Sequence, residues 1–101
     1  MKREYIVGEQ IKIACEFRVG DVLTGILTDP TTIRFRFLPP VGGVVTYTYL
    51  LDPQVVRDAA GIYHVDLVLA AEGRWYLRFE SDGDVVGADE YFVKVVPSPF
   101  V

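Results

Sequence analysis

The stretch that decides the fold is Ile11-Lys12-Ile13-Ala14-Cys15-Glu16-Phe17-Arg18-Val19. Its odd-numbered residues are apolar, whereas its even-numbered residues are charged or small. Successive side chains of a β-strand point to opposite faces, so this alternation predicts a strand with one buried and one solvent-facing side. A slip of one residue would bury three charged side chains, and the pattern therefore fixes which face lies inward.

The same alternation of apolar and polar residues continues along the rest of the chain, and no segment has a helical period. It recurs around residues 33–37, 45–51, 63–69, 75–79 and 91–95, and a short segment at 54–57 is expected to pair at a sheet edge. Turn signals separate these segments at Gly20-Asp21, Asp29-Pro30, Gly42-Gly43, Asp52-Pro53, Glu72-Gly73 and Ser81-Asp82-Gly83-Asp84. The sequence predicts about seven or eight short antiparallel strands.

An immunoglobulin-like antiparallel β-sandwich is the fold that this pattern favours. The aromatic residues expected to point inward and fill the space between two sheets are Phe17, Phe35, Phe37, Trp75 and Phe79. Val19 and Leu51 are also assigned to the inner face. Because the chain has a single cysteine, an antibody-type domain with its disulfide is excluded. A small closed β-barrel is the alternative, since alternation alone does not separate the two folds.

Size and composition allow one domain spanning residues 1–101, with residues 97–101 as a Pro-rich tail. The chain has 101 residues, of which 50% are hydrophobic, and a formal net charge of −4. A core of roughly 100 residues is the usual unit, and the acidic balance argues against a nucleic-acid-binding protein. No signal peptide or membrane-spanning run is recognised, so we expect a protein assembled in the host cytoplasm, without a membrane partner.

Residues that could carry chemistry are few. Cys15 lies on the apolar face of its strand, where a thiol behaves as a small hydrophobe. His64 and Asp66 share a polar face and are interpreted as a solvated pair, with an enzyme built on them as the rival hypothesis. The turn Asp82-Gly83-Asp84 matches only the beginning of a calcium loop. We expect no enzymatic activity, no metal and no cofactor.

The outward faces of three strands offer a more specific candidate. In an immunoglobulin-like arrangement the strands around residues 34–36, 74–78 and 90–94 are neighbours. Their outward arginine and aromatic residues would then share one face, with these members: Arg34, Arg36, Arg74, Tyr76, Arg78 and Phe92. Arginine and tyrosine are enriched at protein interfaces. The face is either a protein-binding surface, a solvated surface laced with ion pairs, or an anion site for phosphate or sugar acids.

A second candidate is a loop with four aliphatic residues where polar ones are expected: Val22, Leu23, Ile26 and Leu27. It is either an extra edge strand that covers the core or an exposed apolar patch for a partner. Both candidates favour a subunit that works in contact with other protein subunits, as a homo-oligomer or in a larger assembly.

Several short motifs occur in a characteristic order. The first half of the chain contains Gly8-Glu9, Asp29-Pro30-Thr31-Thr32 before Ile33-Arg34-Phe35, and Pro39-Pro40-x-Gly42 before Tyr47-Thr48-Tyr49. The second half contains Val56-Arg57-Asp58-x-x-Gly61-Ile62-Tyr63, Gly73-Arg74-Trp75 and Glu90-x-Phe92-x-x-x-Val96-x-Ser98. From about residue 8 to residue 98 the chain thereby resembles small immunoglobulin-like structural proteins of tailed bacteriophages and prophages. It departs from them in the apolar loop at residues 23–27.

This resemblance implies a non-enzymatic component of a virion, at the head, the neck or head–tail connector, or as a decoration protein. It supplies no catalytic residues. The alternative function is a carbohydrate- or cell-surface-binding module in which Trp75, Tyr76 and Phe92 form a stacking platform. A buried position for Trp75 counts against that alternative.

Overall fold

The computed structural model describes residues 4–19, 25–82 and 87–100. Within these ranges the chain forms strands and no helix. The strands are β1 (Glu4–Ile6), β2 (Gln10–Glu16), β3 (Arg18–Val19), β4 (Ile26–Leu27), β5 (Thr32–Leu38), β6 (Val45–Thr48), β7 (Val55–Ala59), β8 (Ile62–Val68), β9 (Gly73–Asp82) and β10 (Gly87–Val96). After Val96, residues 97–100 belong to no strand, and Phe100 is exposed.

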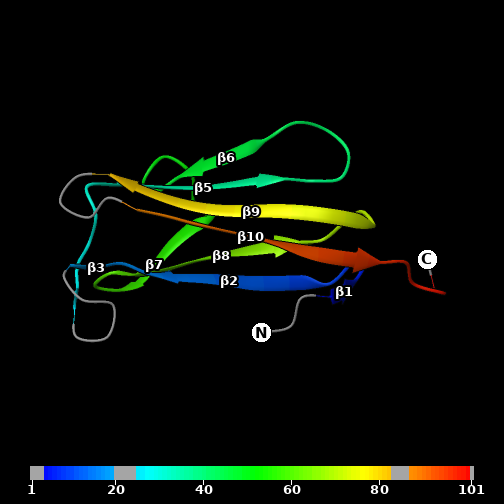
Figure 1. Ribbon diagram of the computed structural model, residues 1–101, viewed down its shortest axis with the longest axis horizontal. Coiled ribbons are helices and arrows are strands. Elements are labelled where there is room, and N and C mark those ends of the chain that lie inside the picture. Colours follow the sequence, from blue (N-terminus) through cyan, green and yellow to red (C-terminus); the bar gives the residue numbers. More distant parts are fainter. Residues whose placement is uncertain (1–3, 20–24, 83–86, 101) are drawn as a thin grey trace.

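Two open sheets pack face to face (Figure 1). One has five strands in the order β1-β10-β9-β5-β6, and the other has three in the order β2-β8-β7. Neighbours are antiparallel except for β1 and β10, which run parallel. This order confirms the immunoglobulin-like β-sandwich, and because both sheets have free edges the closed barrel is excluded. The predicted edge segment appears as β7, and β3 and β4 add a small ribbon.

The core lies between the inner faces of the two sheets, where the five predicted aromatic side chains are all buried. Phe35 and Phe79, directly opposite each other on β5 and β9, have ring centroids 5.0 Å apart. Trp75 stacks on Phe37 and donates its indole N–H to the carbonyl of Ala71 at 2.9 Å. Strand alternation thus places a continuous aromatic layer on one side of the large sheet and its polar residues on the other.

Two residues assigned inward from the sequence are exposed. Val19 is 48% exposed because the chain leaves the three-stranded sheet after Glu16 and continues in the β3–β4 ribbon. Leu51 is 81% exposed because β6 ends at Thr48 and a turn follows, in which Leu50 has a φ of +74°. Asp52 closes this turn, since its carboxylate accepts the N–H of Thr48 at 2.8 Å. The alternating pattern continues beyond the strand in both places.

One carboxylate joins three distant parts of the sandwich. Asp29 accepts hydrogen bonds from the Arg57 guanidinium at 3.0 and 3.1 Å, from the Gly61 N–H at 2.9 Å and from the Tyr63 hydroxyl at 2.7 Å. The hydrogen bond from Arg57, followed by those from Gly61 and Tyr63, holds the pKa of Asp29 well below its usual range. The sequence suggested only a turn at this aspartate.

Candidate functional site

The six residues predicted to share a face do so. They lie on the outer side of β5, β9 and β10 in the five-stranded sheet, and this surface is called the arginine face below. Arg36 lies opposite Arg78, which lies opposite Glu90 on β10. Residues directly opposite each other in a sheet point to the same side, and their inward neighbours Phe35, Leu77 and Phe79 are buried. The register therefore brings the predicted residues together, as expected for the immunoglobulin-like strand order.

The arginine face is organised in rows that cross the strands. Two of these rows lie next to each other. The charged row contains, from β5 to β9 to β10, Arg36, Arg78 and Glu90. The apolar row contains, in the same strand order, Leu38, Tyr76 and Phe92. Leu38, Tyr76 and Phe92 are each exposed by 36 to 43%. Partly exposed apolar side chains thus lie beside charged ones on this face.

Glu80 organises the charges next to these rows. Its carboxylate accepts hydrogen bonds from Arg34 Nε at 3.2 Å and from Arg78 Nε at 2.9 Å. Its partial burial raises the pKa, but the hydrogen bonds from Arg78 and Arg34 outweigh that effect and leave the pKa of Glu80 lowered. Arg34 also pairs with Asp82 at 2.8 Å, and Arg78 pairs with Glu90 at 2.8 Å. Two of the arginines are therefore held in place by two carboxylates each.

Arg36 is engaged much less. Its nearest carboxylate oxygen is that of Glu80 at 3.6 Å, beyond hydrogen-bond distance, and no described residue accepts a hydrogen bond from its guanidinium. Its side chain is 43% exposed. Arginine carries five N–H donors in a fixed plane that suits a carboxylate. Arg36 thus offers these donors to a partner more readily than Arg34 or Arg78.

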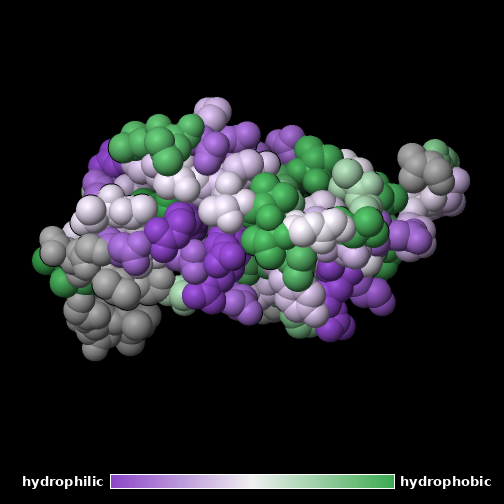
Figure 2. Space-filling model, turned by 90° about the horizontal axis from the view of Figure 1, so that it is seen from above, coloured by the Kyte–Doolittle hydropathy of each residue, from purple (hydrophilic) through white to green (hydrophobic). Residues whose placement is uncertain are grey.

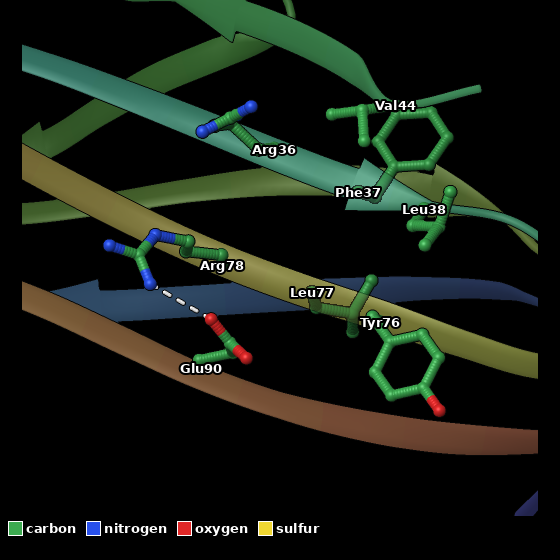
Figure 3. A pocket seen from close by; sticks show the side chains of 8 residues that line it. All are labelled: Arg36, Phe37, Leu38, Val44, Tyr76, Leu77, Arg78 and Glu90. Atoms are coloured by element: carbon green, nitrogen blue, oxygen red, sulfur yellow. Dashed lines mark hydrogen bonds and ion pairs between the residues drawn. The ribbon is translucent and has the colours of Figure 1, made fainter.

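A shallow hollow of about 320 Å³ lies over the charged row and over Leu38 and Tyr76 of the apolar row (Figure 3). Arg36, Arg78 and Glu90 lie at one end, and Leu38, Val44 and Tyr76 at the other. Phe37 and Leu77 also line it. Seen from the β6 side, hydrophobic residues adjoin strongly hydrophilic ones over much of the surface (Figure 2). A group that is apolar at one end and acidic at the other would match the hollow chemically.

Sequence reasoning missed the apolar contribution of Leu38 and Val44. The signal was present for Leu38, which continues the polar phase of Arg34 and Arg36 and therefore had to point outward with them. Val44 is 52% exposed and precedes β6 across the hairpin. Val44 does not stand out in the sequence as part of a surface, because it lies where a strand meets its connection.

The second predicted site is described only in part, because Val22 and Leu23 lie outside the described residues. Ile26 and Leu27 form β4 and pair with β3. Ile26 is 76% exposed, whereas Leu27 is half-buried. Arg18 donates to the Gly25 carbonyl at 2.9 Å and ties the start of β4 to β3. For Ile26 and Leu27, the structure thus shows a short edge ribbon and one exposed apolar residue, so features of both predicted alternatives are present.

The residues weighed for catalysis lie away from the arginine face. His64 is on the outer side of the three-stranded sheet, and its Nδ1 contacts Asp58 at 2.7 Å, while Nε2 is 3.6 Å from Asp66. The expected partner Asp66 is thus the more distant of the two. Burial, and then the nearby charges of Asp89 and Glu16, raise the pKa of the Cys15 thiol to about 11. Among the described residues no cluster of three metal-ligating side chains occurs.

The aromatic side chains separate into buried and exposed ones. Trp75 is only 4% exposed and belongs to the core. Tyr76 and Phe92 reach the surface, with centroids 6.3 Å apart and planes inclined by 53°. The guanidinium of Arg74 lies 4.5 Å from the Phe92 ring centroid. A stacking platform of three rings is therefore reduced to Tyr76 and the part of Phe92 that Arg74 leaves open.

Comparisons of the chain with protein-family models, with curated proteins and with solved structures give no match. The resemblance to phage immunoglobulin-like proteins consequently rests on the sequence motifs alone. Within the part of the chain that the structure describes, no helix is long and apolar enough to cross a membrane.

Proposed function

We propose that this chain is a non-enzymatic structural subunit that binds a protein partner through its arginine face, as a component of a tailed-phage or prophage particle. The observation that carries the proposal is the exposed apolar row of Leu38, Tyr76 and Phe92, in register across three strands. Apolar side chains that are exposed next to one another are a feature of protein interaction sites. The sequence motifs supply the phage context.

Arg36 supports a partner of defined chemistry. It lines the hollow without a hydrogen-bonded acceptor among the described residues, whereas Arg34 and Arg78 are each held by two carboxylates. A partner that places a carboxylate on Arg36 and an apolar side chain over Leu38 and Tyr76 satisfies both ends of the hollow. Charged hydrogen bonds of this kind add direction to the apolar contact.

Mass spectrometry of density-purified particles from the source culture tests the phage context. We expect peptides of this chain at a fixed ratio to the major shell protein, and that ratio separates a ring at one vertex from a coat-wide decoration. Absence of the chain from clean particles would overturn the virion assignment.

A matched pair of variants tests the face. Leu38→Ser places a polar group in the apolar row, and Val56→Ser makes a similar change at a 40% exposed valine on β7, in the other sheet. We expect Leu38→Ser to lower incorporation into particles at least about tenfold, as for an apolar residue that a partner covers, and Val56→Ser to leave it unchanged. Equal incorporation of both would remove the arginine face as the binding surface.

A carbohydrate-binding module is the competing proposal. It would use Tyr76 and Phe92 without Trp75, whose ring is buried. A glycan array that shows specific binding abolished by Tyr76→Ser, together with absence from particles, would favour it.

A further inference from the structure

In the two rows of the arginine face the residues at one end complement those at the other end, which binding to an unrelated partner does not require. In each row the middle residue is on β9, with one neighbour on β5 and the other on β10. The charged row has a cation, Arg36, at its β5 end and an anion, Glu90, at its β10 end. The apolar row has Leu38 and Phe92 at the corresponding ends. The two ends of each row are thus chemically complementary to each other.

A two-fold axis parallel to β9, placed between two facing sheets, lays β5 of one copy over β10 of the other. Arg36 then faces Glu90 of the second copy, and Leu38 faces Phe92 of the second copy. Tyr76 meets its own counterpart near the axis. The contacts away from the axis are each made twice, as in every isologous dimer, whereas Tyr76 meets its counterpart once.

We propose that the arginine face binds a second copy of this chain about such an axis. The inference rests on the proposed function, because it uses the same face, and it names the partner. The charges of the rows favour this partner over others, since the two-fold pairs Arg36 with a carboxylate at both ends of the interface.

The charged groups at the two ends are available for this contact. Arg36 has no hydrogen-bonded acceptor among the described residues, and the side chain of Glu90 is 58% exposed. Glu90 uses one oxygen to accept from Arg78, which leaves the other for a second guanidinium. Arg78 lies near the axis and faces its own counterpart, but Glu80 and Glu90 neutralise it within each copy.

The shape of the face agrees with the same arrangement. The hollow lies towards β5, where Leu38, Val44 and Tyr76 line it. The two-fold places the β10 side of the second copy over this hollow, and that side carries Phe92, a 39% exposed ring backed by Arg74. A partly exposed ring on one half of the face thus lies over the hollow in the other half.

Sedimentation equilibrium of the purified full chain tests the proposal. We expect a monomer–dimer equilibrium in which Arg36→Glu and Glu90→Arg each raise the dissociation constant at least about tenfold, because each places like charges together twice. A mixture of the two variants should form a heterodimer. In one of its contacts the introduced carboxylate of the first variant faces the introduced guanidinium of the second, and in the other contact the original pair of Arg36 and Glu90 remains. Lys12→Glu, an exposed charge change on β2 of the other sheet, should leave the dimer intact.

The outcomes separate this inference from the proposed function. Dimers that tolerate both charge variants, or variants that fail to form a heterodimer, would overturn the arrangement. A chain that stays monomeric at every soluble concentration would overturn the second copy as partner. If Leu38→Ser nevertheless lowers incorporation into particles, the face still binds a protein, and that protein is a different one.

Discussion

Asp29 and Glu80 each accept several hydrogen bonds, but Asp29 connects separate segments of the fold, whereas Glu80 contacts only side chains on the surface. Asp29 accepts from a guanidinium, from the main-chain N–H of Gly61 and from the buried Tyr63 hydroxyl. Glu80 accepts only from arginine side chains on the outer face. The first carboxylate joins the connection before β5 to β7 and β8, whereas the second arranges side chains on strands that are already paired through their main chains.

The difference teaches how to separate polar groups that hold a fold from polar groups that shape a surface. When the removal of a carboxylate leaves a buried donor without an acceptor, the folded state is destabilised by the desolvation free energy of that donor. A carboxylate among half-exposed arginines leaves partners that water or a second acid can satisfy. Substitutions around Asp29 should therefore change stability, and substitutions around Glu80 should change binding.

The largest effect on stability is expected at Gly61, which donates to Asp29. Its φ is +69°, and a Cβ there would lie 2.7 Å from both the Phe17 carbonyl oxygen and the Thr28 nitrogen. These are main-chain atoms that cannot move aside, so Gly61→Ala should destabilise the protein by about 3 kcal/mol or more in urea denaturation. Gly8→Ala is the control, because Gly8 also has a positive φ but nothing within 4 Å. An equal loss in both variants would reduce the effect to backbone strain alone.

Tyr63→Phe should give the next largest effect. The change removes the hydroxyl that donates to Asp29 at 2.7 Å and keeps the ring, which is 1% exposed. A hydrogen bond to a charged group is stronger than one to a neutral group, and we expect a loss of stability smaller than that of Gly61→Ala, because Asp29 is partly exposed to water. Tyr49→Phe is the matched control on the neighbouring ring, 5.1 Å away. Thermal unfolding of both variants checks the expectation, and a similar loss for Tyr49→Phe would show that the ring contact matters more than the hydroxyl.

Acid should weaken the Asp29 junction in a predictable pH range. Because its pKa is lower in the folded protein than in the unfolded chain, the carboxylate stabilises the fold fully above its unfolded pKa of about 4. That stabilisation decreases as the pH falls below this value and is lost as the pH passes the folded pKa. Melting temperatures of the wild type and of Asp29→Asn should therefore converge as the pH is lowered from 7 to 2.5. A constant difference would contradict the assignment.

The sequence was sufficient for the parts of this molecule that depend on alternation. The inward position of Trp75 follows from the side-chain period, whereas the pairing of β5, β9 and β10 was expected from the immunoglobulin-like arrangement. Alternation turns the six predicted residues of the arginine face outward, and the expected strand order makes them neighbours. It does not show where a strand ends, and the predictions for Val19 and Leu51 are wrong for that reason.

Contacts between residues far apart in the chain could not be predicted from the sequence. Asp29 meets Tyr63 across 34 positions, and nothing local to either residue indicates the contact. The same holds for Arg36, whose availability depends on a separation of 3.6 Å from Glu80 where Arg78 has 2.9 Å. Distances of this kind result from register and twist together, and not from residue type.

The smallest effect on stability is expected for Glu80→Gln, and it sharpens the contrast with Asp29. Arg34 keeps Asp82 and Arg78 keeps Glu90 after the change, so the loss should stay below about 1 kcal/mol. Binding should suffer more, because Arg36 and Arg78 lie directly opposite each other and Glu80 is the carboxylate that approaches both. Once residue 80 is uncharged, the guanidinium groups of Arg36 and Arg78 repel each other and move away from the positions at which they would contact the second copy. Parallel thermal unfolding and sedimentation of Glu80→Gln and Asp29→Asn would decide the matter. A larger drop in melting temperature for Glu80→Gln would mean that the outer charges hold the fold as well as shape its surface.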